Sequence, residues 1–99
     1  MIAAALLMLA ETVISGDPAI QRRIDQAPKP VHEFIERRAG CNYFASEYPY
    51  SKERERDLLR KARSLRCTAL ERDERALRRL FARRLDILDL LAKTQYVIY

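Results

Sequence analysis

The chain has 99 residues, 48% of them apolar and 33% charged, with a formal net charge of +5. This length indicates a single domain, and the apolar content excludes an intrinsically disordered chain. Glycine occurs only twice, and β-branched residues nowhere alternate with polar ones, so we expect no β-strands. We therefore predict an all-α fold, a small bundle of four to five helices over residues 17–99, whose positive charge favours acidic partners.

Residues 1–16 contain an uncharged apolar run from Ile2 to Ala10. The run is too short to cross a bilayer, which takes about 20 residues, but it suits the hydrophobic region of a secretory signal peptide. Cleavage after Gly16 would then release a periplasmic or secreted domain. No Lys or Arg precedes the run, so the usual positive start is missing. The alternative is an N-terminal core helix in a cytosolic protein.

The first helix of the domain is expected to begin at Asp17-Pro18, with Asp17 as N-cap and proline in the first turn. It extends from Ala19 to about Gln26 and must end before Pro28.

The second helix is expected to begin near Pro30 and to end at Gly40, which stands where a C-terminal capping glycine belongs. Cys41 would then directly follow the helix end. One face of this helix is traced at helical spacing by Val31, Phe34, Ile35, Arg38 and Ala39.

Residues 41–50 are predicted to form a loop, and half of the aromatic residues of the chain lie within it: Tyr43, Phe44, Tyr48 and Tyr50. Two interpretations stay open. The aromatic side chains either cover the helical core as a lid or form a partner-binding patch, since Tyr and Phe make rigid anchors at interfaces.

A long helical stretch is expected from Ser51, as N-cap, to Gln95, with Glu53 complementing the helix dipole in the first turn. Such a helix would be far longer than average, so breaks are expected. One is predicted near Cys67-Thr68 and another between Arg83 and Asp86, where Asp86 could cap a last helix.

The two cysteines, Cys41 and Cys67, favour a structural disulfide. In an exported protein two cysteines usually pair, and a bond across this loop would contribute about 3–4 kcal/mol through the entropy of the unfolded chain. The alternative is two buried thiols that pack as small apolar groups. A zinc site is disfavoured, because only His32 accompanies two distant cysteines.

The remaining titratable residues give no catalytic pattern. His32 has no nucleophile near it in sequence, and Asp73 and Glu74 stand among arginines, which favours a salt-bridged surface over acid–base chemistry. We therefore expect a protein that is not an enzyme and that needs no cofactor or metal.

Positive charge is concentrated in residues 52–84, which contain thirteen Lys or Arg and only six Asp or Glu. Glu74 and Arg78 lie at i, i+4 and are expected to pair. The surplus predicts a basic face at Arg78, Arg79, Arg83 and Arg84. It supports an alternative function, a cytosolic basic module that binds nucleic acid, although no known nucleic-acid-binding motif accompanies it.

The segment from Cys67 to Phe81, CTALERDERALRRLF, resembles the core of the LprI-like lysozyme-inhibitor family. Residues 34–38, with Cys41 and the aromatic positions after it, are similar to short exported proteobacterial proteins. The LprI-like pattern continues into a Trp and a further Cys, which this chain lacks.

The resemblance implies a small, exported, helical protein that binds and inhibits a cell-wall hydrolase, with the aromatic loop as the contact surface. The leading prediction is therefore an exported, non-enzymatic binding module. Its partner is expected to be a protein or an anionic component of the cell envelope.

Overall fold

The computed structural model describes residues 13–98, and in this part of the chain it contains helices and no strand. The helices are α2 (Pro18–Gln26), α3 (Lys29–Ser46), α4 (Lys52–Ser64), α5 (Leu70–Leu80) and α6 (Leu85–Lys93), with a 3₁₀ turn, η1 (Cys67–Ala69), between α4 and α5. The predicted all-α bundle is confirmed. The apolar run from Ile2 to Ala10 lies outside the described residues, so its role as signal peptide or core helix stays a prediction.

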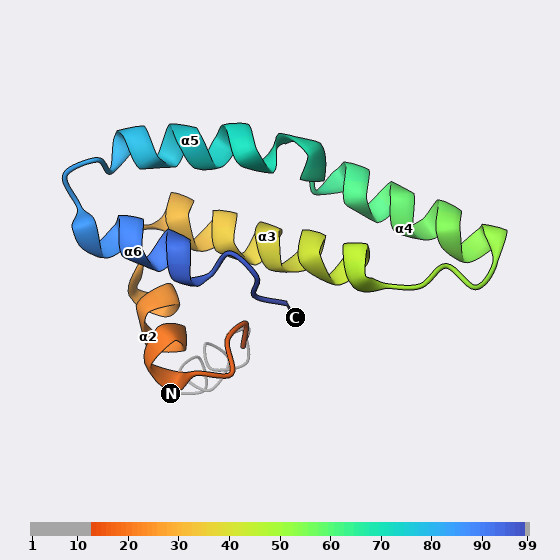
Figure 1. Cartoon of the computed structure of the whole chain (residues 1–99), viewed down its shortest axis with the longest axis horizontal. Helices are drawn as coiled ribbons and strands as arrows, with labels where there is room; N and C mark the ends of the chain where they lie inside the picture. Colours follow the sequence, from red (N-terminus) through yellow and green to blue (C-terminus); the bar gives the residue numbers. More distant parts are fainter. Residues whose placement is uncertain (1–12, 99) are drawn as a thin grey trace, which may run out of the picture.

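Helix α3 is the central element of the fold, because each of the other α-helices contacts it. Helices α4 and α5 follow one another along its length in the opposite direction, and α6 returns beside it (Figure 1). Helix α2 packs against α3 and α6 near the start of α3.

The hydrophobic core lies where α2, the first half of α3 and α6 meet. Helix α5 and the residue that follows it cover the core with partly buried side chains, including Leu77 and Phe81. Apolar side chains buried there leave water, which is the main driving force of folding. The buried residues of this core are Ile14, Ile24, Val31, Phe34, Ile35, Ala39, Ile87, Leu90 and Leu91.

Residues 41–64 form a helical hairpin, the α3–α4 arm, made of the end of α3 and all of α4. The arm extends away from the end of the molecule that holds the core (Figure 1). Only Cys41 and Leu58 are buried in it, and neither belongs to the core cluster.

The predicted helix starts are confirmed by their capping contacts. The Asp17 carboxylate accepts a 2.9 Å hydrogen bond from the Ala19 N–H, and the Ser51 hydroxyl oxygen accepts one from the Arg54 N–H at 3.1 Å. Both side chains satisfy N–H groups that have no partner within the first turn of a helix.

The prediction that Gly40 ends the second helix is wrong. Helix α3 runs through the buried Gly40 to Ser46, so the expected loop of residues 41–50 is confined to residues 47–51. A glycine inside a helix costs only about 1 kcal/mol relative to alanine. The packing of the following residues against α4, together with the bond at Cys41, offsets that cost.

Both predicted breaks in the long helical stretch are present. After Leu65 the chain turns at Arg66, which has a φ of 53°, and continues as η1. The second break begins at Phe81 and ends at Arg84, which is the N-cap of α6. The prediction that Asp86 caps this helix is therefore wrong. Asp86 lies in the first turn, where its negative charge complements the helix dipole.

Candidate functional site

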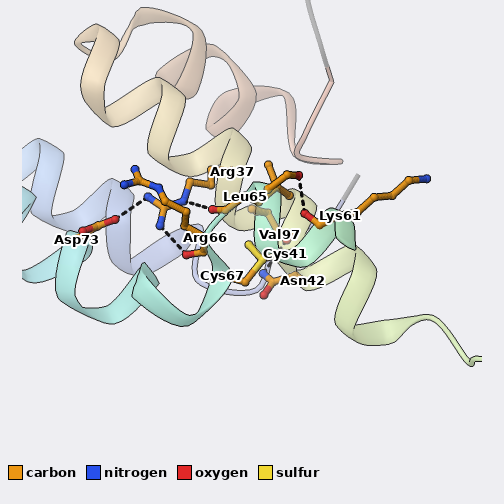
Figure 2. Close-up of a disulfide and its surroundings, with 10 residues drawn as sticks. Arg37, Cys41, Asn42, Lys61, Leu65, Arg66, Cys67, Asp73 and Val97 are labelled. Atoms are coloured by element: carbon orange, nitrogen blue, oxygen red, sulfur yellow. Dashed lines mark hydrogen bonds and ion pairs between the residues drawn. A yellow bond between two sulfur atoms is a disulfide. The ribbon is translucent and has the colours of Figure 1, made fainter. Parts of the chain in front are cut away.

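The predicted disulfide between Cys41 and Cys67 is confirmed, with the two Cα atoms 5.7 Å apart. Cys41 lies within α3 and Cys67 begins η1, so the bond closes the base of the α3–α4 arm (Figure 2). Structural disulfides occur mostly in proteins of oxidising compartments.

A second tie at the base of the arm comes from Arg37, whose guanidinium points at the turn between α4 and α5 (Figure 2). It donates hydrogen bonds to the carbonyl oxygens of Leu65 and Arg66 at 2.5 and 2.8 Å, and it pairs with Asp73 at 2.8 Å. Arg37 holds the pKa of the Asp73 carboxyl below its usual value, chiefly through this hydrogen bond. The contacts fix the direction in which α4 leaves the bundle.

The neighbouring Arg38 is buried, with 4% of its surface exposed. Its guanidinium donates to Glu74 at 2.8 Å, to the Leu91 carbonyl at 2.7 Å and to the Thr94 hydroxyl at 2.8 Å. Burial lowers the pKa of Arg38, and the nearby Glu74 carboxylate opposes that shift. Arg38 therefore connects α3 to α5 and α6 through charge-assisted hydrogen bonds.

The first two aromatic residues of the predicted loop lie on the last turns of α3. The rings of Tyr43 and Phe44 meet edge to face at 5.3 Å, and the Lys61 ammonium lies 5.6 Å from the centre of the Phe44 ring. A hydrogen bond to the Glu47 carboxylate, together with its charge, raises the pKa of Tyr43. The contact of Lys61 with Phe44 joins the end of α3 to α4 below the loop.

The other two aromatic residues, Tyr48 and Tyr50, are 80% and 78% exposed in the loop of residues 47–51. The lid interpretation is therefore wrong for this pair. Their loop joins α3 to α4 at the outer end of the arm, which we call the tip (Figure 1). Their role as partner-binding residues stays a prediction.

The four arginines of the predicted basic face lie at the end of α5 and in the turn before α6. Arg78 pairs with Glu74 at 2.9 Å, as expected, and Arg84 pairs with Asp86 at 3.0 Å. The hydrogen bond between Arg84 and Asp86 raises the pKa of the guanidinium and lowers that of the carboxyl. Two of the four charges are thus compensated locally.

The other two arginines, Arg79 and Arg83, are exposed. Within residues 13–98 their side chains have no ion pair or hydrogen bond. Nucleic-acid binding through this face stays a prediction.

His32, in α3, connects this helix to α2. Its Nδ1 lies 2.8 Å from the Ile24 carbonyl oxygen near the end of α2, and its Nε2 lies 3.0 Å from the Glu36 carboxylate. In the described part of the chain, no group of three or more His, Cys, Asp or Glu side chains is placed to hold a metal ion.

An open cleft of about 720 Å³ lies between the first half of α3 and α5. Its lining includes the apolar side chains of Phe34, Leu77 and Leu80, and the ion pair of Arg37 with Asp73 lies among them. None of the helices described here is long and apolar enough to cross a membrane.

The sequence alone could identify the aromatic residues and the basic face, but it missed Arg37 and the role of Arg38. The available signal was the place of Arg38 on an otherwise apolar helix face, since a charge on such a face needs a buried partner. No protein family, curated protein or solved structure matches this chain.

Proposed function

We propose that this protein is an exported, non-enzymatic binding module whose α3–α4 arm inhibits a lysozyme-type cell-wall hydrolase. The observation that carries the proposal is the exposure of Tyr48 and Tyr50, which lie two positions apart in the loop at the tip. Exposed tyrosines on a protruding loop are efficient interface anchors, because each offers a large, rigid contact area with few rotatable bonds.

The base of the arm supports this role. The Cys41–Cys67 disulfide and the contacts of Arg37 hold both of its helices, and Ser51 caps α4 directly after the tip. A pre-ordered loop loses little conformational entropy on binding, which favours affinity.

The class of partner follows from the chemistry of the tip and from the resemblance of residues 67–81 to LprI-like inhibitors. Glycoside hydrolases place two carboxyl groups on either side of the scissile bond, within a concave site. A tyrosine hydroxyl donates a hydrogen bond to a carboxylate, and its ring packs against the walls of such a cleft. The net charge of +5 favours encounter with an acidic cleft.

The proposal is tested by measuring the hydrolysis of peptidoglycan by a lysozyme-type muramidase in the presence of the oxidised protein. We expect inhibition by the native chain and a loss of about 30-fold in inhibitory affinity for Tyr48→Ser with Tyr50→Ser, as for hot-spot residues. Thermal stability should stay unchanged because both side chains are exposed.

Tyr96→Ser is the matched control, since Tyr96 is 82% exposed but lies beyond α6, outside the arm. It should inhibit like the native chain. Inhibition that survives the double tyrosine substitution would show that the tip is not the contact surface. No inhibition by the native chain would reject the hydrolase as partner.

Export is tested separately, by the intact mass of the protein recovered from the periplasm or the medium. We expect a mass without residues 1–16 and with the cysteines oxidised. Recovery of the reduced, full-length chain from the cytosol alone would reject the exported state.

A further inference from the structure

Two exposed leucines flank the turn between α5 and α6. Leu80, at the end of α5, is 70% exposed, and Leu85, at the start of α6, is 77% exposed. At helical spacing Leu85 continues the row formed by Leu77 and Phe81, but α5 ends at Leu80 and Leu85 is exposed at the start of α6. Two large apolar side chains are thus exposed at the two ends of one short turn, where an apolar partner can reach them.

The same turn is strongly basic. From Arg75 to Leu85 the sequence holds five arginines and no Asp or Glu. Arg79 precedes Leu80 and Arg83 lies two residues before Leu85, and both are exposed. Their guanidinium groups have no partner among residues 13–98, so their charge is available to a ligand. We call residues 78–85 the α5–α6 knob.

We infer that the α5–α6 knob binds the surface of a membrane that carries anionic lipids. Leu80 and Leu85 insert into the boundary between headgroups and acyl chains, while Arg79 and Arg83 contact lipid phosphates. Apolar side chains bordered by Lys or Arg are the usual composition of surfaces that lie in this interface.

The leucines favour a membrane over a nucleic acid as the partner. A nucleic acid would use the same arginines for its phosphates, together with aromatic side chains for stacking or a helix that enters a groove. It would make no use of two exposed leucines at a turn. The apolar surface also continues from Leu80 into the cleft beside Leu77 and Phe34.

The position of the knob leaves the α3–α4 arm free. The turn between α5 and α6 and the tip with Tyr48 and Tyr50 lie at opposite ends of the molecule (Figure 1). A protein bound to a membrane at one end would present the tip at the other. The inference rests on contacts separate from those of the proposed function.

The first test is co-sedimentation of the oxidised full chain with two kinds of vesicle, phosphatidylcholine alone and an equimolar mixture with phosphatidylglycerol. We expect binding only to the anionic vesicles, and weaker binding as salt is added. Arg79→Gln with Arg83→Gln should lower the partition coefficient about 25-fold, at about fivefold per arginine. Leu80→Ser with Leu85→Ser should lower it by about tenfold per leucine.

Matched controls come from α4. Arg56→Gln with Arg63→Gln removes the same charge from exposed positions, and Leu59→Ser changes a leucine that is 52% exposed. Both control variants should bind the anionic vesicles within about threefold of the native chain, because exposed side chains away from the contact contribute little to binding. Equal losses in knob and control variants would show that only net charge matters and would overturn the inference.

The second test reports insertion directly. The chain has no tryptophan, so Leu85→Trp introduces a single fluorophore at the knob. Its emission should shift to the blue on anionic vesicles and be quenched by brominated acyl chains. Leu59→Trp should show neither effect. If the emission of Leu85→Trp does not shift on vesicles that bind the protein, the inference is wrong.

A labelled RNA or DNA duplex is the competing probe. Binding to it that needs Arg79 and Arg83 but not Leu80 and Leu85, without vesicle binding, would assign the knob to nucleic acid instead. The Tyr48 and Tyr50 double variant should bind vesicles normally, and the leucine variant should inhibit the hydrolase normally. Hydrolase inhibition through the tip and vesicle binding through the α5–α6 knob are therefore tested independently, and one can fail while the other holds.

Discussion

The two ends of the molecule are stabilised by different kinds of interaction. At the core, α2, the first half of α3 and α6 bury Ile24, Val31, Ile35, Leu90 and Leu91 almost completely. The α3–α4 arm buries only Cys41 and Leu58, and its base is held by the disulfide and by Arg37.

This difference shows how a small chain can support a long projection. Apolar burial stabilises a structure in proportion to the area removed from water, and two packed helices alone remove little. A covalent bond and charge-assisted hydrogen bonds act at single points, so they can fix the base of the arm without enlarging the core. The arm thereby keeps an outer end that is free to meet a partner.

The largest effect is expected at the core, from Arg38→Ala. The substitution removes the buried donor of three hydrogen bonds, to Glu74, the Leu91 carbonyl and Thr94, and Glu74 keeps only its pair with Arg78. The free energy of unfolding should therefore fall by about 3–5 kcal/mol. Urea denaturation followed by circular dichroism measures the loss. The double variant Arg38→Met with Glu74→Leu should recover most of it. A loss below about 1 kcal/mol for Arg38→Ala would contradict a stabilising role for the buried charge.

Replacement of both Cys41 and Cys67 with alanine tests the arm. The bond joins residues 26 apart, so its loss should lower the free energy of unfolding by about 3.5 kcal/mol in the chain-entropy model. Hydrogen exchange should speed up more in residues 42–64 than in α6, because the disulfide is one of the contacts that hold the base of the arm. If amide protection in residues 42–64 relative to α6 is the same with and without the disulfide, the disulfide does not hold the arm.

A smaller effect, of opposite sign, is expected at the turn that follows α4. Arg66 has a φ of 53°, a left-handed conformation that costs a residue with a side chain about 1–2 kcal/mol. Arg66→Gly should therefore raise the free energy of unfolding by about 1 kcal/mol, and its carbonyl can still accept the bond from Arg37. Arg63→Gly, inside α4, should lower it by about the same amount. Destabilisation by Arg66→Gly would show that the Arg66 side chain itself is needed.

The smallest effect concerns pH. Arg37 lowers the pKa of Asp73 in the folded protein below the ordinary value of about 3.9. The stability contributed by this pair is complete above that ordinary value and is lost as pH falls through the lowered one, because the unfolded chain then binds the proton more tightly. Thermal melts between neutral pH and strong acid should show this loss. In Asp73→Asn the melting temperature should fall less steeply with falling pH than in the native chain. Asp86 and Asp89, whose pKa values are also lowered, should account for a further part of the acid-induced loss of stability. If the melting temperature of Asp73→Asn depends on pH as that of the native chain does, the pair of Arg37 with Asp73 does not contribute to the acid-induced loss of stability.

The features predicted from sequence are those set by neighbouring residues. Asp17 and Ser51 cap helices through their own next turn, so the local sequence was sufficient. The pairing of Cys41 with Cys67 followed from their number and from the expected compartment, and it did not depend on knowing the fold.

The features that sequence reasoning missed depend on distant partners. Arg37 contacts Leu65 across 28 positions, and Arg38 contacts Thr94 across 56. No local pattern encodes such a pairing, which arises only when the helices assemble. Gly40 was misread for the same reason, because glycine is a helix terminator only where tertiary packing does not extend the helix past it.

The position of the Cys41–Cys67 disulfide has one more consequence, for proteolysis. The loop of residues 47–51, exposed from residue 48 onward, is the natural site for a protease to cut, since loop tips with accessible backbone are cleaved first. Both chain segments next to such a cut remain covalently joined through the base of the arm. A nicked molecule would therefore persist as a two-chain protein with its core intact, and its fragments would separate only after reduction.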